Sequence, residues 1–325
     1  MSSNLIPSAI DFLSVGSMDI AAVIPTRNRV ALLEKCLVSL CEQTLAPERY
    51  EICAVDNGST DNTKEIFAAV AARFPRHRLF MLDEPKAGVA RARNRGFYGT
   101  TAPLVAMGDD DATMPPDWLE RYTKRFAELG EDVVAMGGDI VPVWQAPKPA
   151  WLTPRMMGIL SAAAETGNKP QFVEPPQNLI ESNCCYRRAA LESVGGFPNE
   201  LGRVGTLLLS GEGSVNMVLH KKAGRLFYDP EIVIHHVIHA NRLNPMWFRQ
   251  RYFWQGISGY VAHRYYEKHG LNVMNAIQLS LPLKRGDWDF VREDTAVGLE
   301  DSTIKFESLG FVLAMSGIIQ AEDGA

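Results

Sequence analysis

The stretch DIAAVIPTRNRVALLEKCLVSLCEQ, residues 19–43, decides the fold. Its first part, residues 19–25, is a short apolar run closed by a proline, which is typical of a buried strand. In residues 30–43 the apolar side chains recur every three or four positions, along one side of a helix. The stretch therefore predicts a strand followed directly by a helix.

The same strand–helix pair recurs along the next hundred residues. Strands are expected at EICAVDN from Glu51, RLFMLDE from Arg78 and PLVAMGDD from Pro103, and helices at 61–73, at 88–98 and from Pro115 onward. Four such units in a row predict a mostly parallel sheet covered by helices on both faces. Ligands bind beyond the carboxyl ends of the strands in such sheets, and polar clusters lie there at 26–28, 56–58 and 109–111.

Beyond Gly130 the pattern is less regular. We expect strands at 133–143, 178–186, 225–228 and 231–234, and helices at 212–223, 245–268 and 304–320. Residues 1–18 have neither a basic start nor an uninterrupted apolar core, so we expect a flexible arm rather than a secretory signal.

Composition limits the class of protein. A chain of 325 residues, 46% of them hydrophobic, can bury a full core. The net charge of −5 argues against a general nucleic-acid binder. Five cysteines without a CxxC pair indicate a reduced, cytoplasmic protein. Because no run of about eighteen apolar residues is present, we expect a soluble or peripherally attached chain, with contact at the inner face of the membrane left open.

Asp109, Asp110 and Asp111 follow a buried strand and repel one another, so something should compensate their charge. Oxygen ligands without metal-like His–Cys spacing suit Mn²⁺ or Mg²⁺ shared with substrate phosphates. A solvated acidic loop, or caps for the next helix, is the alternative. Arg91, Arg93 and Arg95 lie near a helix start, where they either reach a diphosphate or form a solvated face.

Other polar residues allow two interpretations each. Asp56 fits a ligand contact, but DNGSTD is also a good turn and helix-start sequence. Glu212 fits a general base or a helix cap. His235, His236 and His239 are close enough in sequence that one could contact phosphate or metal, although a structural role is open for each.

Taken together, these motifs resemble the family-2 glycosyltransferases with the GT-A fold, over about residues 19–260. The resemblance lies in AAVIPTRNR from Ala21, VDNGSTD from Val55, GVARARNRG from Gly88, GDDDATMPPDWL from Gly108, VGGFP from Val194, SGEGS from Ser210 and YDPEIVIHHV from Tyr228. It implies a metal-dependent enzyme that inverts the anomeric centre and moves a sugar from a nucleotide diphosphate, UDP first, to an acceptor hydroxyl.

The resemblance also implies a set of site residues. The implied donor pocket contains Pro25, Thr26, Asn28, Arg29, Asp56, Arg93, Asn94, Asp109, Asp110 and Asp111. The implied metal ligands are Asp109, Asp111 and His236, and the implied base is Glu212. His235 and His236 are expected near the acceptor or diphosphate. Apart from the resemblance, Trp144 fits an acceptor platform, because sugar rings stack on aromatic faces, or packing in the core. One departure matters: Gly213 stands where the family commonly has a second acid.

The implied organisation is a GT-A domain over 19–243, with a nucleotide-sugar half (19–130) and an acceptor half (131–243), followed by a helical extension over 244–325. The expected acceptor is a carbohydrate or lipid-linked sugar in polysaccharide, glycolipid or glycoconjugate biosynthesis. A homodimer or membrane contact through 304–320 is left open. The rival functions are a nucleotidyltransferase, although PTRNR replaces its usual Gly-rich loop, and an inactive nucleotide-sugar-binding protein, suggested by Gly213.

Overall fold

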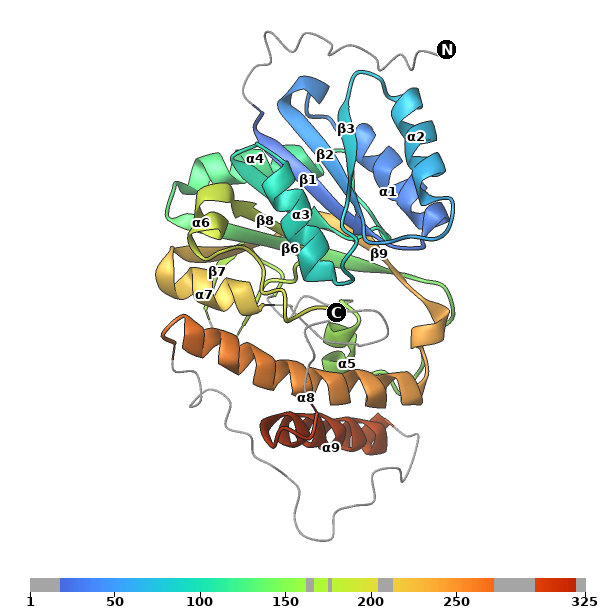
Figure 1. The fold of residues 1–325 in the computed structure, drawn as a ribbon, viewed down its shortest axis with the longest axis vertical. Helices are drawn as coiled ribbons and strands as arrows, with labels where there is room; N and C mark the ends of the chain where they lie inside the picture. The colour runs from blue at the N-terminus through green and yellow to red at the C-terminus, as the bar shows by residue number, and fades with distance from the viewer. Residues whose placement is uncertain (1–17, 162–166, 175–176, 204–212, 272–295, 320–325) are drawn as a thin grey trace, which may run out of the picture.

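A computed structural model describes residues 18–161, 167–174, 177–203, 213–271 and 296–319 (Figure 1). The first four strands and their helices are those that the sequence predicts. The strands are β1 (Ile20–Thr26), β2 (Tyr50–Asp56), β3 (Arg78–Asp83) and β4 (Leu104–Gly108), and the helices are α1 (Val30–Cys41), α2 (Thr63–Arg73), α3 (Val89–Gly99) and α4 (Trp118–Leu129). The strands lie in the order β3-β2-β1-β4, and all three pairs are parallel.

The sheet continues beyond β4 as a mixed half. β8 (Asn183–Arg187) is antiparallel to both β4 and β6 (Val133–Trp144), and β6 is parallel to β9 (Arg225–Ile238). Two short strands, β5 (Ala112–Thr113) and β7 (Gln171–Val173), pair antiparallel with β9. The two strands expected at 225–228 and 231–234 are one strand of 14 residues, because a register shift near Asp229 lets pairing with β6 continue past Pro230.

Helices cover both faces of the sheet, as predicted. Alternate residues of β1 enter two separate cores: Ile20 and Ile24 pack with α1 and α4, whereas Val23 packs with α3 and two later helices. Those later helices are α6 (Arg188–Ser193) and α7 (Ser214–Lys222). Met18, which the sequence places in a free arm, packs against the second core, and the rest of that arm lies outside the described residues.

Two long helices lie at the end of the molecule away from β3, with α9 beyond α8 (Figure 1). α8 (Pro245–Lys268) matches its prediction, whereas α9 (Ala296–Met315) begins and ends earlier than expected. They meet at two glycines: a Cβ on Gly256 would lie 1.9 Å from the Glu307 carbonyl oxygen, and one on Gly310 would lie 2.0 Å from that of Phe253. In the described part of the chain, every helix is too short or too polar to cross a bilayer.

Candidate active site

The acidic cluster lies where the strand order of the sheet reverses. The chain runs from β1 to β2 on one side of β1, while β4 pairs with the other side. Such a switch point leaves a crevice at the carboxyl ends of the two central strands. Thr26 ends β1 and Asp109 follows β4, so both belong to that crevice.

Asp110 is bound to the end of β1. Its carboxylate is 4% exposed and accepts hydrogen bonds from Oγ1 of Thr26 and Nη1 of Arg29, each at 2.8 Å. Burial raises the pKa of Asp110 to about 6, although the Arg29 charge opposes the rise. Asp110 therefore joins the loop after β4 to the end of β1 and the loop that follows it.

Asp111 is contacted by two arginines and a histidine. Nη1 of Arg29 lies 2.6 Å from Oδ2, Nε2 of His239 lies 3.1 Å from the same oxygen, and Nη2 of Arg242 lies 3.7 Å away. Burial works to raise the pKa of Asp111, but the neighbouring histidines and Arg29 outweigh it and hold that pKa well below its usual range. Asp111 is therefore ionised at neutral pH.

β9 brings the histidines to the cluster. β5 pairs with β9 so that Ala112 lies opposite His236 and Thr113 opposite His235. Because successive strand side chains point to opposite faces, His236 is buried beside Asp111 while His235 is exposed. The structure thus brings His236 and His239 to the acids but not His235.

Asp109, Asp111 and His236 form a candidate cation site, because their ligand atoms all lie within 4.8 Å of one another. Oδ1 of Asp111 is buried and has no hydrogen-bond partner, although Nε2 of His236 lies 3.2 Å from it. An unsatisfied carboxylate oxygen beside a second carboxylate and an imidazole fits a divalent ion such as Mn²⁺. The imidazole is an addition to the oxygen-only set that the acidic run alone predicts.

Arg93 is the member of the arginine run that turns inward. It is 6% exposed and its Nη2 lies 3.2 Å from Oδ1 of Asp109, whereas Arg95 is exposed. Nη1 of Arg93 pairs with Glu181, which is 2% exposed and which no sequence motif marked. The only hint in the sequence is a lone acid in the apolar stretch NLIESNCCY.

The other predicted donor residues hold loops in place. Oδ1 of Asp56 accepts from the Ser59 backbone N–H at 2.8 Å, which is the turn role that its motif also allowed. Oδ1 of Asn28 accepts from the Thr60 N–H at 2.7 Å and so joins the loops after β1 and β2. Pro25 is buried within β1.

Asn94 and Trp144 lie in packed surroundings. The Asn94 amide donates to the Phe197 carbonyl and accepts from the Phe197 N–H, both at 2.8 Å, so it holds that loop. Trp144 ends β6 and packs with Trp151 and Trp247 around a cluster formed with α5 (Pro154–Ile159) and α8. Donor binding by Asn94 and acceptor binding by Trp144 stay predictions.

Glu212 lies outside the described residues, but its neighbour Gly213 is described. Gly213 precedes α7 with a φ of 86°, a conformation that favours glycine. A Cβ there would lie 1.4 Å from Nδ2 of Asn178. This position therefore has no room for the acid that the family resemblance leads one to expect.

Arg242, which follows YDPEIVIHHV in the motif that carries the resemblance, adds positive charge to the site. It is 8% exposed, and burial together with the charge of Arg203 lowers its pKa to about 10. Arg29 and Arg242 both contact Asp111, and two guanidinium groups beside the acids are a favourable place for an anion such as a diphosphate.

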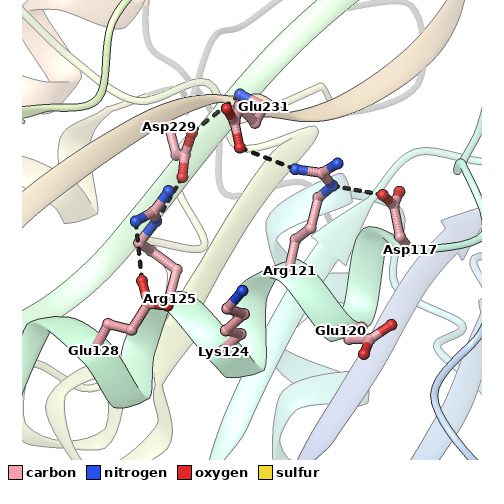
Figure 2. A pocket seen from close by; sticks show the side chains of 8 residues that line it. All are labelled: Asp117, Glu120, Arg121, Lys124, Arg125, Glu128, Asp229 and Glu231. Carbon is pink, nitrogen blue, oxygen red and sulfur yellow. Dashed lines mark hydrogen bonds and ion pairs between the residues drawn. The ribbon is translucent and has the colours of Figure 1, made fainter.

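A second charged region lies between α4 and β9, around a hollow of about 290 Å³ (Figure 2). Arg125 pairs with the buried Asp229 at 2.7 Å, and Arg121 bridges Asp117 at 2.6 Å and Glu231 at 3.1 Å. These ion pairs join β9 to α4. They fix β9 just before the segment that carries the histidines.

Comparison with known proteins gives a family match and several relatives. The model of Glycosyl transferase family 2 matches residues 21–195, more than half of the chain. Glucosyl-dolichyl phosphate glucuronosyltransferase of Haloferax volcanii is 33% identical over 181 residues, which cover 55% of this chain and 57% of that protein. Validoxylamine A glucosyltransferase of Streptomyces hygroscopicus subsp. limoneus is 37% identical over 118 residues, 36% of this chain and 26% of that protein. The chain thus spans little more than half the length of the first relative.

Solved structures share the fold. The mannosyltransferase PcManGT from Pyrobaculum calidifontis, in complex with GDP-Man and Mn²⁺, has a TM-score of 0.58 and 19% identity over 93% of this chain and 75% of that chain. S. aureus TarS 1-349, in complex with UDP-GlcNAc, has a TM-score of 0.55 and 14% identity over 92% of both chains. At these identities the likeness establishes the fold, which is the GT-A type that the motifs predict.

Proposed function

Because the chain belongs to glycosyl transferase family 2, we propose that it is an inverting glycosyltransferase that moves a sugar from a nucleotide diphosphate to an acceptor hydroxyl. The observation that carries the proposal is the cluster of Asp109, Asp111 and His236 at the switch point of the sheet. A carboxylate pair at this position is suited to the donor diphosphate through a shared divalent ion.

The roles of the residues follow from their contacts. Asp109, Asp111 and His236 would hold Mn²⁺ or Mg²⁺, which when bound neutralises charge on the leaving diphosphate. Arg29 and Arg242 lie against Asp111 and can turn to phosphate oxygens when the donor enters. Because Oδ1 of Asp56 accepts the Ser59 N–H, we assign Oδ2 to the nucleotide base; Nζ of Lys64 lies 4.0 Å from this oxygen.

On the acceptor side we assign the proton-accepting role to Glu212 and a stacking surface to Trp144. Sugar rings stack on aromatic faces, and Trp144 lies in a group with Trp151 and Trp247. Because Gly213 carries no acid, Glu212→Gln is expected to lower the transfer rate by about 10²–10⁴-fold while donor affinity and melting temperature stay unchanged. A variant that transfers sugar at the wild-type rate would place the base elsewhere.

The donor and acceptor are proposed by class. UDP-sugars come first, and GDP- and dTDP-sugars belong in the same panel because one neighbour of the same fold was solved with GDP-Man and another with UDP-GlcNAc. The name of the 33% identical relative contains a lipid-linked sugar, which supports testing lipid-linked as well as free carbohydrate acceptors. Such an acceptor would bring the chain to the cytoplasmic face of a membrane, where the exposed Met315 and Ile318 of the C-terminal segment provide apolar contact.

The test is to incubate the protein with this donor panel, with and without Mn²⁺, and to measure release of nucleoside diphosphate. A glycosyltransferase releases it in a metal-dependent manner, and faster with the right acceptor. A nucleotidyltransferase instead releases pyrophosphate from a nucleoside triphosphate. An inactive binding protein shows a donor-induced rise in melting temperature without release.

A further inference from the structure

We infer that Glu181 is a positioning residue for the acidic cluster: it balances the charge of Arg93 and so leaves Asp109 free to bind a divalent cation. The inference rests on the metal role proposed above. It concerns a residue that neither the motifs nor the resemblance marked.

The guanidinium group of Arg93 lies between two carboxylates, those of Glu181 and Asp109. Arg93 comes from α3, Glu181 from the segment that leads into β8, and Asp109 from the end of β4. Nη1 of Arg93 pairs with Oε2 of Glu181, while Nη2 lies 3.2 Å from Oδ1 of Asp109. The guanidinium group is a rigid fork, so the contact with Glu181 also fixes how Arg93 meets Asp109.

Charge shows why the second carboxylate matters. With Glu181 ionised, the three groups carry a net charge of −1, and the Arg93 charge is shared between two acids. Without Glu181, Arg93 and Asp109 sum to zero, and the guanidinium charge acts on Asp109 without this second carboxylate beside it. With one negative charge fewer beside the cluster, the attraction for a divalent ion is weaker.

Asp109 is the acid of the cluster that is most open to this effect. Asp110 accepts hydrogen bonds from Thr26, which is buried, and from Arg29, which is half-buried. The side chain of Asp109 is 29% exposed, compared with 2% for Asp111. An entering cation therefore reaches Asp109 first. How closely Arg93 pairs with Oδ1 of Asp109 then sets the negative charge that this oxygen offers to the cation.

The experiment measures Mn²⁺ binding to the full chain by calorimetry, without donor. Glu181→Gln is expected to weaken Mn²⁺ binding by about 10–100-fold, the range found when a residue behind a metal ligand is changed. Glu181→Asp keeps the charge and is expected to keep most of the affinity. The double variant Arg93→Gln/Glu181→Gln removes both charges and is expected to bind Mn²⁺ more tightly than Glu181→Gln.

Glu51→Gln is the matched control. Glu51 is also fully buried and paired with an arginine, Arg78, at 3.2 Å, but it lies at the start of β2, at the opposite end of the sheet from the cluster. This variant should lower the melting temperature and leave the Mn²⁺ affinity unchanged. It separates the loss of a buried ion pair from an effect on the metal site.

A second readout is catalytic: saturating Mn²⁺ should restore the transfer rate of Glu181→Gln, which a merely structural defect would not allow. Equal Mn²⁺ affinity of wild type and Glu181→Gln overturns the inference, as does a double variant that binds more weakly than the single one. Both outcomes leave the proposed function standing. A wild-type chain that binds no Mn²⁺, even at millimolar concentration, overturns the metal role and this inference together.

Discussion

Asp111→Asn tests the charge balance of the site, because it removes one charge from a carboxylate that several cations contact. Arg29 lies 2.6 Å from Asp111 and His239 lies 3.1 Å from it, and the acid itself is 3% exposed. Removing one partner of a buried ion pair costs about 3–5 kcal/mol. Asparagine keeps one oxygen that can accept these hydrogen bonds, so we expect the lower end, about 3 kcal/mol. The unfolding entropy of about 2.1 cal/mol/K per residue corresponds to about 1.5 °C per kcal/mol for 325 residues, so the melting temperature should fall by about 4–5 °C.

The same change should remove a metal ligand. We expect Mn²⁺ affinity to fall by more than about a hundredfold, since loss of a ligand exceeds the effect of changing a residue behind it. Asp110→Asn is the matched control, because Asp110 is equally buried and also bonded to Arg29 but is not in the Asp109, Asp111 and His236 cluster. Because Arg29 is shared between Asp110 and Asp111, this control should lose some Mn²⁺ affinity, but far less than Asp111→Asn, which loses the ligand itself.

Thermal melts in EDTA and then in Mn²⁺ provide the assay. A ligand that binds only the native state raises the melting temperature by mass action. Wild type and Asp110→Asn should show this rise, whereas Asp111→Asn should start lower and show none. An Asp111→Asn protein that melts at or above the wild-type temperature in EDTA, and gains as much from Mn²⁺, would refute both the ion-pair and the metal argument.

Two further predictions concern the acid motif and the C-terminal helix. Gly213→Ala should destabilise the fold by about 2 kcal/mol or more in chemical denaturation, because its Cβ would meet Asn178, whereas Gly58→Ala, with a similar φ of 78° and open space, should cost less. Equal midpoints for the two variants would contradict the crowding at 213. Wild type and Tyr98→Glu should co-sediment with phosphatidylcholine vesicles while Ile318→Glu should not, since Ile318 is 72% exposed in an apolar segment. Negligible pelleting of all three would remove the membrane contact.

The parallel half of the sheet could be predicted because its signals are local. Each strand is a short apolar run and each helix has its own apolar spacing, so four units follow from reading the chain in order. The polar residues after the strands then fall at one edge without any knowledge of long-range contacts. This is why Thr26, Asp56 and Asp109–Asp111 could be assigned to the crevice from sequence.

The partners of those residues could not be predicted, because they depend on contacts between distant segments. On sequence alone, three adjacent aspartates predict repulsion, and hence that Asp111→Asn would stabilise the protein. In the structure Arg29 and His239, 82 and 128 residues away, surround that acid and reverse the expected sign. The roles of the histidines also depend on long-range pairing. His235 and His236 are adjacent and alike in sequence, but the strand turns His236 into the protein and His235 toward solvent.

The candidate site includes residues that lie beyond the part of the chain matched by the family model. The match ends at residue 195, and within it lie Asp109 and Asp111. His236, His239 and Arg242, which contact Asp111, all come from the segment beyond it. The matched part therefore supplies the acids, and the segment from the end of β9 to Arg242 supplies several of the side chains that contact Asp111. The ion pairs between α4 and β9 join α4 to the strand that leads into this segment, beside a site built mainly from β1 and β4.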